Sequence, residues 1–384
     1  MLKLKKKSDC CGCGACFQIC PANCINMKTD EEGFKYPVID TDSCTRCGIC
    51  VKVCPVINKG KKTQPVKILA AKNHSKETVN TSSSGGVFSV LAEHITASGN
   101  FVFGAGFNEN WEVIHYGTSD PAEISSFRTS KYVQSDTAQS FLKIRSLLDA
   151  GKTVLFSGTP CQVRGLKLFL TKDYENLLTV DFICHGVPSP GIWKKYLQAI
   201  LNKNSVSSIK GIGKINFRDK SLGWRKFSLK ISSYENKTIL SESLKENSFL
   251  IGFLKDLYLR PSCHSCPSKG LSSGSDITIA DFWGVQSILP DFNDDKGISL
   301  VILNTDKMEN ILKDSCHIAD VDKKVLKKNY ALHNSVRMNF NRKKFFQELG
   351  TGAELEPLIL KYSKHSYLDR FLRKLSIILS RIFN

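Results

Sequence analysis

The sequence has no run of apolar residues that approaches the roughly 18 residues of a membrane-spanning helix. Residues 1–7 are rich in lysine and lead directly to cysteines, so they lack the apolar core of a secretory signal. No unit of roughly 20 to 50 residues is repeated, and no recognised nucleic-acid-binding motif is present. We therefore expect a cytoplasmic protein with no nucleic-acid partner.

Acidic residues are comparatively few. The 384 residues include 36 Asp and Glu against 54 Lys and Arg, a formal net charge of +18. Such an excess usually favours nucleic acid, an anionic membrane or an acidic partner. The count treats every cysteine as neutral, however, so metal-bound thiolates would reduce it. With 41% hydrophobic and 23% charged residues, the chain is expected to form two or three globular domains.

Cysteine is the residue type that the sequence has in excess. There are 15 cysteines, and ten of them precede residue 55. In a reducing compartment, a cysteine-dense segment is more commonly a set of metal ligands than a disulfide framework, and an odd total also fits disulfides poorly. The count therefore indicates bound metal in the N-terminal segment.

The early cysteines repeat one spacing. The pattern C-x2-C-x2-C-x3-C-P occurs at residues 10–21 and again at residues 44–55. Three cysteines of each motif suit three corners of an iron–sulfur cube, and the fourth suits the other cube. The predicted ligands of two [4Fe–4S] clusters are Cys10, Cys13, Cys16 and Cys54 for one, and Cys44, Cys47, Cys50 and Cys20 for the other. Cys11 and Cys24 fall outside the pattern.

The alternative for this segment is a pair of zinc knuckles. Zinc needs four thiolates per site but does not explain the doubled spacing with its prolines, so we favour iron–sulfur. The segment resembles the bacterial two-cluster ferredoxin module, which passes single electrons.

Four later cysteines occupy unusual places. Cys161 follows a buried strand at the start of a helix, and Cys184 ends the next strand. Parallel strands end side by side at one edge of a sheet, so these two thiols are expected to be neighbours. The C-x2-C at residues 263–266 needs two further ligands. We hypothesise a third [4Fe–4S] cluster held by Cys161, Cys184, Cys263 and Cys266.

Each of these later residues also has a plainer interpretation. A lone cysteine at a strand end is commonly a small buried hydrophobe, and a lone C-x2-C is commonly a zinc clip or a redox dithiol. His185, beside Cys184, is a candidate catalytic proton donor to a substrate or a flavin. The alternative for His185 is a histidine that is only hydrogen-bonded at the end of a strand.

A polar, basic stretch at residues 58–65 separates the cysteine-dense segment from the rest of the chain. Beyond it, apolar runs alternate with stretches whose apolar residues lie three or four apart, which predicts a mixed α/β body. The expected strands are 67–71, 101–103, 154–156, 177–183, 215–219, 227–239 with a turn at 234–237, 277–280 and 299–303. The expected helices are 87–95, 137–148, 163–170 and 192–201.

Iron–sulfur clusters move one electron at a time, so hydride chemistry needs a two-electron carrier such as a flavin. Hydroxyls, glycines and helix amides suited to a phosphate occur together at Ser82, Ser83, Ser84, Gly85 and Gly86. The alternative is a helix cap at Ser84 followed by two glycines in a turn. Further candidates in expected loops, for which surface charge is the alternative, are Lys131, Tyr132 and Arg218.

Seven motifs occur in a familiar order. They are SSSGGVF at 82–88, SKYVQ at 130–134, LFSGTPCQ at 155–162, DFICHGVP at 181–188, FRDK at 217–220, RPSC at 260–263 and SDITIADFWG at 275–284. Over residues 66–315 the chain thereby resembles the coenzyme F420 hydrogenase/dehydrogenase beta subunit family. The resemblance implies FAD near the Ser-Gly-Gly segment and a [4Fe–4S] cluster on the four later cysteines. Because the family also includes reductases of chlorophyll-type substrates, the resemblance does not select the acceptor.

Four segments are predicted from these patterns, in an overall α+β or mixed α/β fold. They are a ferredoxin-type dicluster domain at 1–60, the N-terminal and C-terminal regions of an α/β flavin-binding body at 66–150 and 151–320, and a helical basic tail at 321–384. Residues 368–382 of the tail have the pattern of a basic amphipathic helix. That helix suits a membrane surface or a partner interface, with packing on the protein's own core as the alternative.

The main hypothesis is an iron–sulfur flavoprotein oxidoreductase. Electrons from a ferredoxin-like donor or a partner redox subunit would pass through the clusters to FAD and leave as hydride to a small two-electron acceptor, such as coenzyme F420, or travel in reverse. One alternative is an electron-transfer subunit without its own substrate. Another is an iron–sulfur nucleic-acid-binding or sensory protein, for which steeply salt-dependent binding would be needed.

Overall fold

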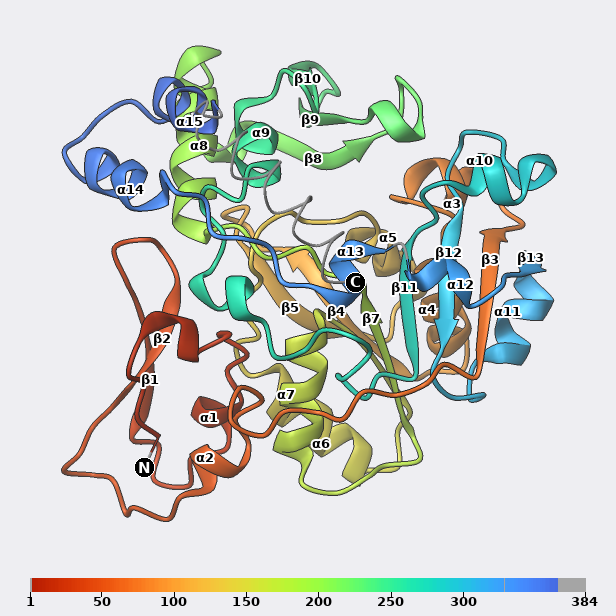
Figure 1. Ribbon diagram of the computed structural model, residues 1–384, viewed down its shortest axis with the longest axis horizontal. Coiled ribbons are helices and arrows are strands. Elements are labelled where there is room, and N and C mark those ends of the chain that lie inside the picture. Colours follow the sequence, from red (N-terminus) through yellow and green to blue (C-terminus); the bar gives the residue numbers. More distant parts are fainter. Residues whose placement is uncertain (1, 328, 365–384) are drawn as a thin grey trace, which may run out of the picture.

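The computed structural model describes residues 2–327 and 329–364. A small ferredoxin-like domain at the N-terminus is followed by a larger α/β body, which is built on a mixed eight-stranded sheet (Figure 1). This is the fold class that the sequence predicts. The amphipathic helix expected at residues 368–382 lies outside the described residues.

The N-terminal domain uses one local conformation twice. A glycine with positive φ precedes each of two four-residue helices, α1 (Ala15–Gln18) and α2 (Ile49–Lys52). The φ angles are 75° at Gly14 and 76° at Gly48, a region in which glycine has no Cβ to clash. Each of these glycines lies between the second and third cysteines of a motif. The two copies of the cysteine spacing therefore form the same glycine-initiated turn and short helix.

An antiparallel hairpin completes the N-terminal domain. It consists of β1 (Ile25–Thr29) and β2 (Lys35–Ile39), which pair along their full length. The Asp30 carboxylate accepts the backbone N–H groups of Glu32 and Phe34 and so closes the turn between the strands.

The large sheet has the strand order β13-β3-β12-β11-β7-β6-β4-β5. Strands β4, β6, β7 and β11 are parallel to their neighbours in that run, and the outer pairings are antiparallel. The bounds are β3 (Lys67–Asn73), β4 (Phe101–Phe107), β5 (Val113–Thr118), β6 (Val154–Ser157), β7 (Leu177–Phe182), β11 (Ile277–Asp281), β12 (Ser299–Leu303) and β13 (Cys316–Asp320).

Helices cover both faces of this sheet. Helices α4 (Val87–Ala97) and α11 (Glu309–Ser315) pack on one face in a continuous apolar core. Helices α6 (Ser140–Asp149) and α7 (Pro160–Leu170) pack on the opposite face, and that core also contains Cys11 and Cys13 of the N-terminal domain. The N-terminal domain therefore docks on the α6/α7 layer (Figure 1).

A second, three-stranded sheet stands above the large one. It has the order β10-β9-β8, with β8 (Ile212–Asp219), β9 (Ser228–Ser233) and β10 (Thr238–Ser243). Its core is shared with α8 (Pro190–Lys203), α9 (Ser248–Leu254) and α15 (Leu355–Ser363). The remaining helices are α3 (Lys76–Thr81), α5 (Ile124–Phe127), α10 (Val285–Ile288), α12 (Lys324–Lys327), α13 (Tyr330–His333) and α14 (Arg342–Gly350).

The predicted strands and helices are confirmed, although the ends of several elements are shifted. Residues 227–239 form two strands around the predicted turn, and β10 extends beyond Ile239. Strands β5 and β13 were not predicted; they add edges to the large sheet.

Strands from both predicted body regions, 66–150 and 151–320, pair within the large sheet, so the predicted domain boundaries stay predictions. In the part of the chain that the structure describes, no helix has the length and apolar character needed to cross a membrane.

Candidate redox centres

The first group of early thiols lies around α1, where Cys13, Cys16 and Cys54 are buried and Cys10 is partly buried. Burial, followed by the nearby thiols of Cys10 and Cys54, raises the pKa of Cys16 to about 12. Cys13 adjoins the same group, because the charges of Cys16 and Cys10 act on its thiol. The structure therefore brings thiols of both motifs together, with Cys50 also close to Cys16 and Cys54; the assignment of one cluster to Cys10, Cys13, Cys16 and Cys54 stays a prediction.

The second group surrounds a separate hollow of about 330 Å³. Its wall combines the last cysteine of the first motif with the first three of the second: Cys20, Cys44, Cys47 and Cys50. Cys24, which the spacing leaves outside the motif, also lines this hollow, and its Sγ lies 3.4 Å from Cys20 Sγ. Cys47 is exposed, so this group reaches the protein surface.

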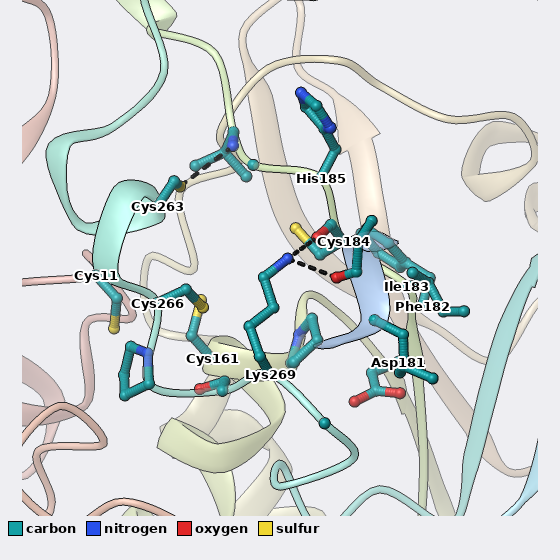
Figure 2. Close-up of a pocket in the computed structure, with 18 of the residues that line it drawn as sticks. Cys11, Cys161, Asp181, Phe182, Ile183, Cys184, His185, Cys263, Cys266 and Lys269 are labelled. Carbon is teal, nitrogen blue, oxygen red and sulfur yellow. Dashed lines mark hydrogen bonds between the residues drawn. The ribbon is translucent and has the colours of Figure 1, made fainter. Parts of the chain in front are cut away.

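The four later cysteines line a single space in the body (Figure 2). Cys161 is the second residue of α7, and Cys184 lies just beyond the end of β7. Cys263 belongs to a short 3-10 turn, Pro261–Ser265, and Cys266 follows it. The space measures about 650 Å³ and is partly open to solvent. The topology thus brings together the four side chains that the sequence groups; the cluster itself stays a prediction.

The environment of these thiols favours a bound metal centre. Burial raises the pKa of Cys263 to about 12 and that of Cys266 to about 11, so the bare thiols hold their protons. A coordinated metal deprotonates a thiol outright and supplies the missing positive charge. The backbone N–H of Val187 donates to Cys263 Sγ at 3.4 Å, a contact typical of the sulfur ligands of iron–sulfur clusters.

Lys269 supports the rim of this space. Its Nζ donates to the backbone carbonyls of Cys184 (2.5 Å) and Ala331 (2.8 Å), as Figure 2 shows for Cys184. The ammonium therefore fixes the loop that follows β7 and places a positive charge beside the four thiols, where it complements thiolates.

Cys11 joins the two parts of the molecule. It lies in the first N-terminal motif, yet it lines the same space as Cys161. Its thiol interacts with Cys13 on one side and Cys161 on the other. The contact with Cys13 and burial raise the pKa of Cys11 well above that of a free thiol, and the contact with Cys161 opposes this rise. Spacing gave no reason to place Cys11 here, because the contact depends on how the domains dock.

In the described residues, no three His, Cys, Asp or Glu side chains are arranged to hold a metal ion. A cube of four irons is larger than one ion, so its four thiolate ligands stand farther apart.

His185 occupies the edge of the space. Its Nε2 lies 2.6 Å from Asp256 Oδ1, and its ring meets Phe253 edge to face at 5.4 Å. Figure 2 shows the ring directed away from the four thiols. The predicted catalytic residue is thus a histidine anchored by a carboxylate; its role in proton transfer stays a prediction.

A second candidate site surrounds Arg218. This residue lies in β8 rather than in a loop, and it is only 4% exposed, so the surface-charge alternative is wrong for it. Its Nη1 donates to Asp281 Oδ2 (2.6 Å) and to the Tyr132 hydroxyl (3.3 Å). Its Nε and Nη2 atoms are buried without a hydrogen-bond partner in the described residues. A buried guanidinium with free donors fits an anionic ligand such as a phosphate.

Aromatic rings flank the Arg218 guanidinium. The Phe227 ring centroid lies 4.2 Å from Cζ, and that of Trp283 lies 5.8 Å from it. Trp283 stacks on Trp224 with an interplanar angle of 8°, although half of its surface is exposed. Sequence reasoning missed Asp281, which binds both Arg218 and Trp224; its place at the end of β11, inside a matched motif, was the available signal.

The Ser-Gly-Gly loop lies beside Arg218. Lys220, two residues further along, donates from Nζ to the carbonyls of Val79 (2.5 Å) and Ser84 (3.3 Å). Ser83 Oγ accepts the backbone N–H of Ser130 at 2.7 Å, which ties the loop to the segment preceding Lys131 and Tyr132. The fold therefore assembles the sequence-predicted flavin candidates in one region.

Details of this loop correct the sequence-based alternative. Gly86, with φ 79°, and not Ser84, is the N-cap of α4, and it provides no side-chain cap; Ser84 Oγ donates to the Ile298 carbonyl instead. Gly85 packs against the sheet, since a Cβ there would lie 2.4 Å from the Ala71 carbonyl oxygen. Ser82 Oγ is buried without a partner in the described residues, a second donor that fits an absent ligand.

Lys131 differs from the other candidates. Its Nζ donates to the backbone carbonyls of Ser126 (2.7 Å) and Arg128 (2.8 Å). Those contacts direct the amine into its own loop, so Lys131 shapes the segment that holds Tyr132 and does not present a free ammonium.

Two parts of the chain match models of known protein families. Residues 151–327 match the family model for the C terminus of the coenzyme F420 hydrogenase/dehydrogenase beta subunit. Residues 9–58 and, in an overlapping match, residues 36–83 match models of a 4Fe-4S dicluster domain. The N-terminal domain is therefore an iron–sulfur domain, as its cysteine spacing predicts.

Similarity to other known proteins is more distant. The F420-reducing [NiFe] hydrogenase complex from Methanosarcina barkeri, in a xenon-derivatised structure, contains a chain that is 18% identical, with a TM-score of 0.47. The match covers 76% of this chain and 94% of that chain. No curated protein matches the sequence.

Proposed function

We propose that the chain is an iron–sulfur flavoprotein oxidoreductase, because residues 151–327 match the model for the C terminus of the coenzyme F420 hydrogenase/dehydrogenase beta subunit and residues 9–58 match a 4Fe-4S dicluster domain. It exchanges electrons between a ferredoxin-like donor or partner redox subunit and a small two-electron acceptor, of which coenzyme F420 is one candidate. When bound, the clusters supply single-electron transfer and FAD supplies the conversion to hydride chemistry.

The convergence of thiols from three distant segments supports this proposal most directly. Cys161, Cys184 and the 263–266 turn line one space, and Cys11 of the iron–sulfur domain lines it with them. If these cysteines were unrelated residues of the core, there would be no reason for four thiols to line one space. The four later cysteines would hold the third [4Fe–4S] cluster, next to the first N-terminal group.

The second N-terminal group provides the contact with the donor. It includes the exposed Cys47, whereas in the first group three thiols are buried, Cys10 is partly buried, and Cys13 packs in the core that contains α7. A protein donor therefore reaches the group at Cys44, Cys47, Cys50 and Cys20 first. The positive surplus of the chain favours an acidic donor surface.

The region around Arg218 would hold FAD. Arg218 offers two free donors to a phosphate, and Asp281 fixes the orientation of its guanidinium. The Ser82 hydroxyl offers a further donor from the Ser-Gly-Gly loop. Trp283 presents an exposed aromatic face beside these donors, which suits a planar ring.

His185 is the candidate proton donor in this scheme. The Asp256 carboxylate holds its Nε2, which leaves Nδ1 available to exchange a proton. Its place at the rim of the third thiol group puts it near the cofactors rather than in the protein core.

A cysteine substitution tests the third site. Cys263→Ser should lower the iron content of the anaerobically reconstituted chain by about four atoms while the N-terminal clusters remain. The matched control is Cys316→Ser, which replaces a buried thiol in β13 that lines neither thiol space. Equal iron in both variants would refute the third cluster.

A flavin that is reoxidised only when a partner protein is present would identify an electron-transfer subunit without its own substrate.

A further inference from the structure

Three arginines of the described chain are buried almost completely, and two of them have a carboxylate partner. Arg218 pairs with Asp281, and Arg342 pairs with Glu32. Arg260 is the most buried of the three, at 1% exposure, yet among the described residues no carboxylate lies within ion-pair distance of it. A buried guanidinium without a counter-charge is costly, so its compensation must come from another group.

The groups around Arg260 belong largely to the iron–sulfur domain. Its Nε donates to the Cys10 carbonyl at 2.8 Å, and Nη2 lies 3.5 Å from Cys10 Sγ and 2.9 Å from the Lys35 carbonyl. Its Nη1 donates to Gln134 Oε1 at 2.9 Å. Arg260 is thus a body residue whose charge lies against a predicted cluster ligand.

Neighbouring contacts hold the guanidinium in that position. The Tyr36 ring centroid lies 4.3 Å from its Cζ, and Gln134 Nε2 donates to the Cys11 carbonyl at 3.0 Å. A Cβ on Gly12 would lie 2.7 Å from Arg260 Nη1, so the glycine between Cys11 and Cys13 leaves room for the guanidinium. The sequence therefore accommodates an arginine against the cysteine loop.

Arg260 is also tied to the third thiol group. Its carbonyl accepts the backbone N–H of Cys263 at 2.9 Å, and its own N–H donates to the Val187 carbonyl at 3.0 Å. One residue therefore spans the Cys10 loop and the Cys263 turn. Its side chain holds the Cys10 loop, and its backbone holds the Cys263 turn.

We propose that Arg260 is the charge partner of the [4Fe–4S] cluster held by Cys10, Cys13, Cys16 and Cys54, and that it raises the reduction potential of that cluster. Arg260 acts as a positioning residue, since it touches a ligand and not the reacting atoms. A cation and a hydrogen bond at a ligand sulfur stabilise the reduced form, which carries one more negative charge. The inference rests on the proposed iron–sulfur function.

Redox titration of the reconstituted full chain, followed by electron paramagnetic resonance, tests this role. In Arg260→Gln, one N-terminal cluster should titrate at a more negative potential, with at least a tenfold shift in its reduced-to-oxidised ratio, about 59 mV for one electron. Arg260→Lys retains the charge but lacks the planar fork, so it should show a smaller shift in the same direction.

The matched control is Arg342→Gln. Arg342 also joins the body to the iron–sulfur domain, but it pairs with Glu32 and the Leu259 carbonyl and with no cysteine. This variant should weaken docking and leave every potential unchanged. An equal shift in Arg342→Gln, or an unshifted potential in a fully loaded Arg260→Gln, would overturn the proposal.

The conservative variant Arg260→Lys covers the case in which Arg260→Gln loses its iron. If Arg260→Gln retains too little iron to titrate, the loaded Arg260→Lys decides, because an unchanged potential there contradicts the proposal and a negative shift supports it. A wild-type chain that binds no iron would instead refute the proposed function itself, and so the two failures are distinguishable.

Discussion

Arg342 and Glu32 form a two-pronged ion pair that joins the body to the hairpin of the iron–sulfur domain. Nη1 lies 2.6 Å from Oε1, and Nη2 lies 2.5 Å from Oε2. Both side chains are nearly buried, at 8% and 11% exposure. The iron–sulfur domain is therefore fixed to the body by a specific polar contact in addition to apolar packing.

Breaking that pair should loosen the domain. Glu32→Gln leaves the Arg342 charge buried without its partner, which typically costs about 3–5 kcal/mol. We expect a lower thermal midpoint and faster proteolysis within the polar stretch 58–65. Glu235→Gln, which removes an exposed pair with Lys237, should leave both unchanged. An intact midpoint in Glu32→Gln would show that the pair does not hold the domains together.

The two cysteine motifs should exchange their last ligands. If Cys20 and Cys47 hold the same cluster, the double variant Cys20→Ser/Cys47→Ser should lose about four irons, no more than either single variant. The double variant Cys54→Ser/Cys47→Ser should lose about eight, because the residues serve different clusters. Iron analysis with cluster spectra measures both. The opposite pattern would mean that each motif binds its own cluster.

Arg218 should control flavin retention. Arg218→Met removes the free donors and the charge, and charge-assisted hydrogen bonds are worth about 1.5–3 kcal/mol each. We therefore expect FAD affinity to fall at least tenfold, measured by fluorescence of the released flavin. Arg225→Gln, a nearby exposed arginine, is the control and should retain FAD. Wild-type affinity in Arg218→Met would place the flavin elsewhere.

Asp181 should make stability depend on pH. Burial raises its pKa to about 6 from an ordinary value of 3.8, despite hydrogen bonds from Ser273 and Thr278. The folded state therefore binds the proton more tightly than the unfolded state, so this group stabilises the fold at low pH and that contribution is lost as pH rises from about 4 to about 6.

Asp181→Asn removes this titration. The thermal midpoint of the variant, relative to that of the wild type, should rise between pH 4 and 6 and stay constant above that range, by an amount equivalent to about 3 kcal/mol. The amide of the variant cannot accept hydrogen bonds from both the Ser273 and the Thr278 hydroxyls. The lost bond lowers the thermal midpoint of the variant by an amount that does not vary with pH. A difference that is constant across this pH range would show that Asp181 does not titrate there.

Much of the architecture was predictable because it depends on local patterns. The doubled cysteine spacing coincides with two glycine-initiated turns, and the grouping of Cys161 with Cys184 depends only on how adjacent parallel strands end. Such features need no knowledge of distant contacts.

The contacts between domains were not predictable in this way. Arg260 contacts Cys10, 250 positions earlier in the chain, and Cys11 reaches the space around Cys161 only because the iron–sulfur domain docks on the body. Arg218 was named among loop residues although it falls within the predicted strand 215–219, and β8 does contain it. Edge strands β5 and β13 were also missed, because their residues lack a clear apolar pattern.

The proposed function depends most on the bound cofactors, and all of them can be measured in a single preparation of the chain. The full chain, purified and reconstituted without oxygen, should contain about twelve irons and about one FAD. It should also show the broad visible absorption of iron–sulfur clusters with a superimposed flavin spectrum. A colourless chain that binds zinc and no flavin would contradict the account.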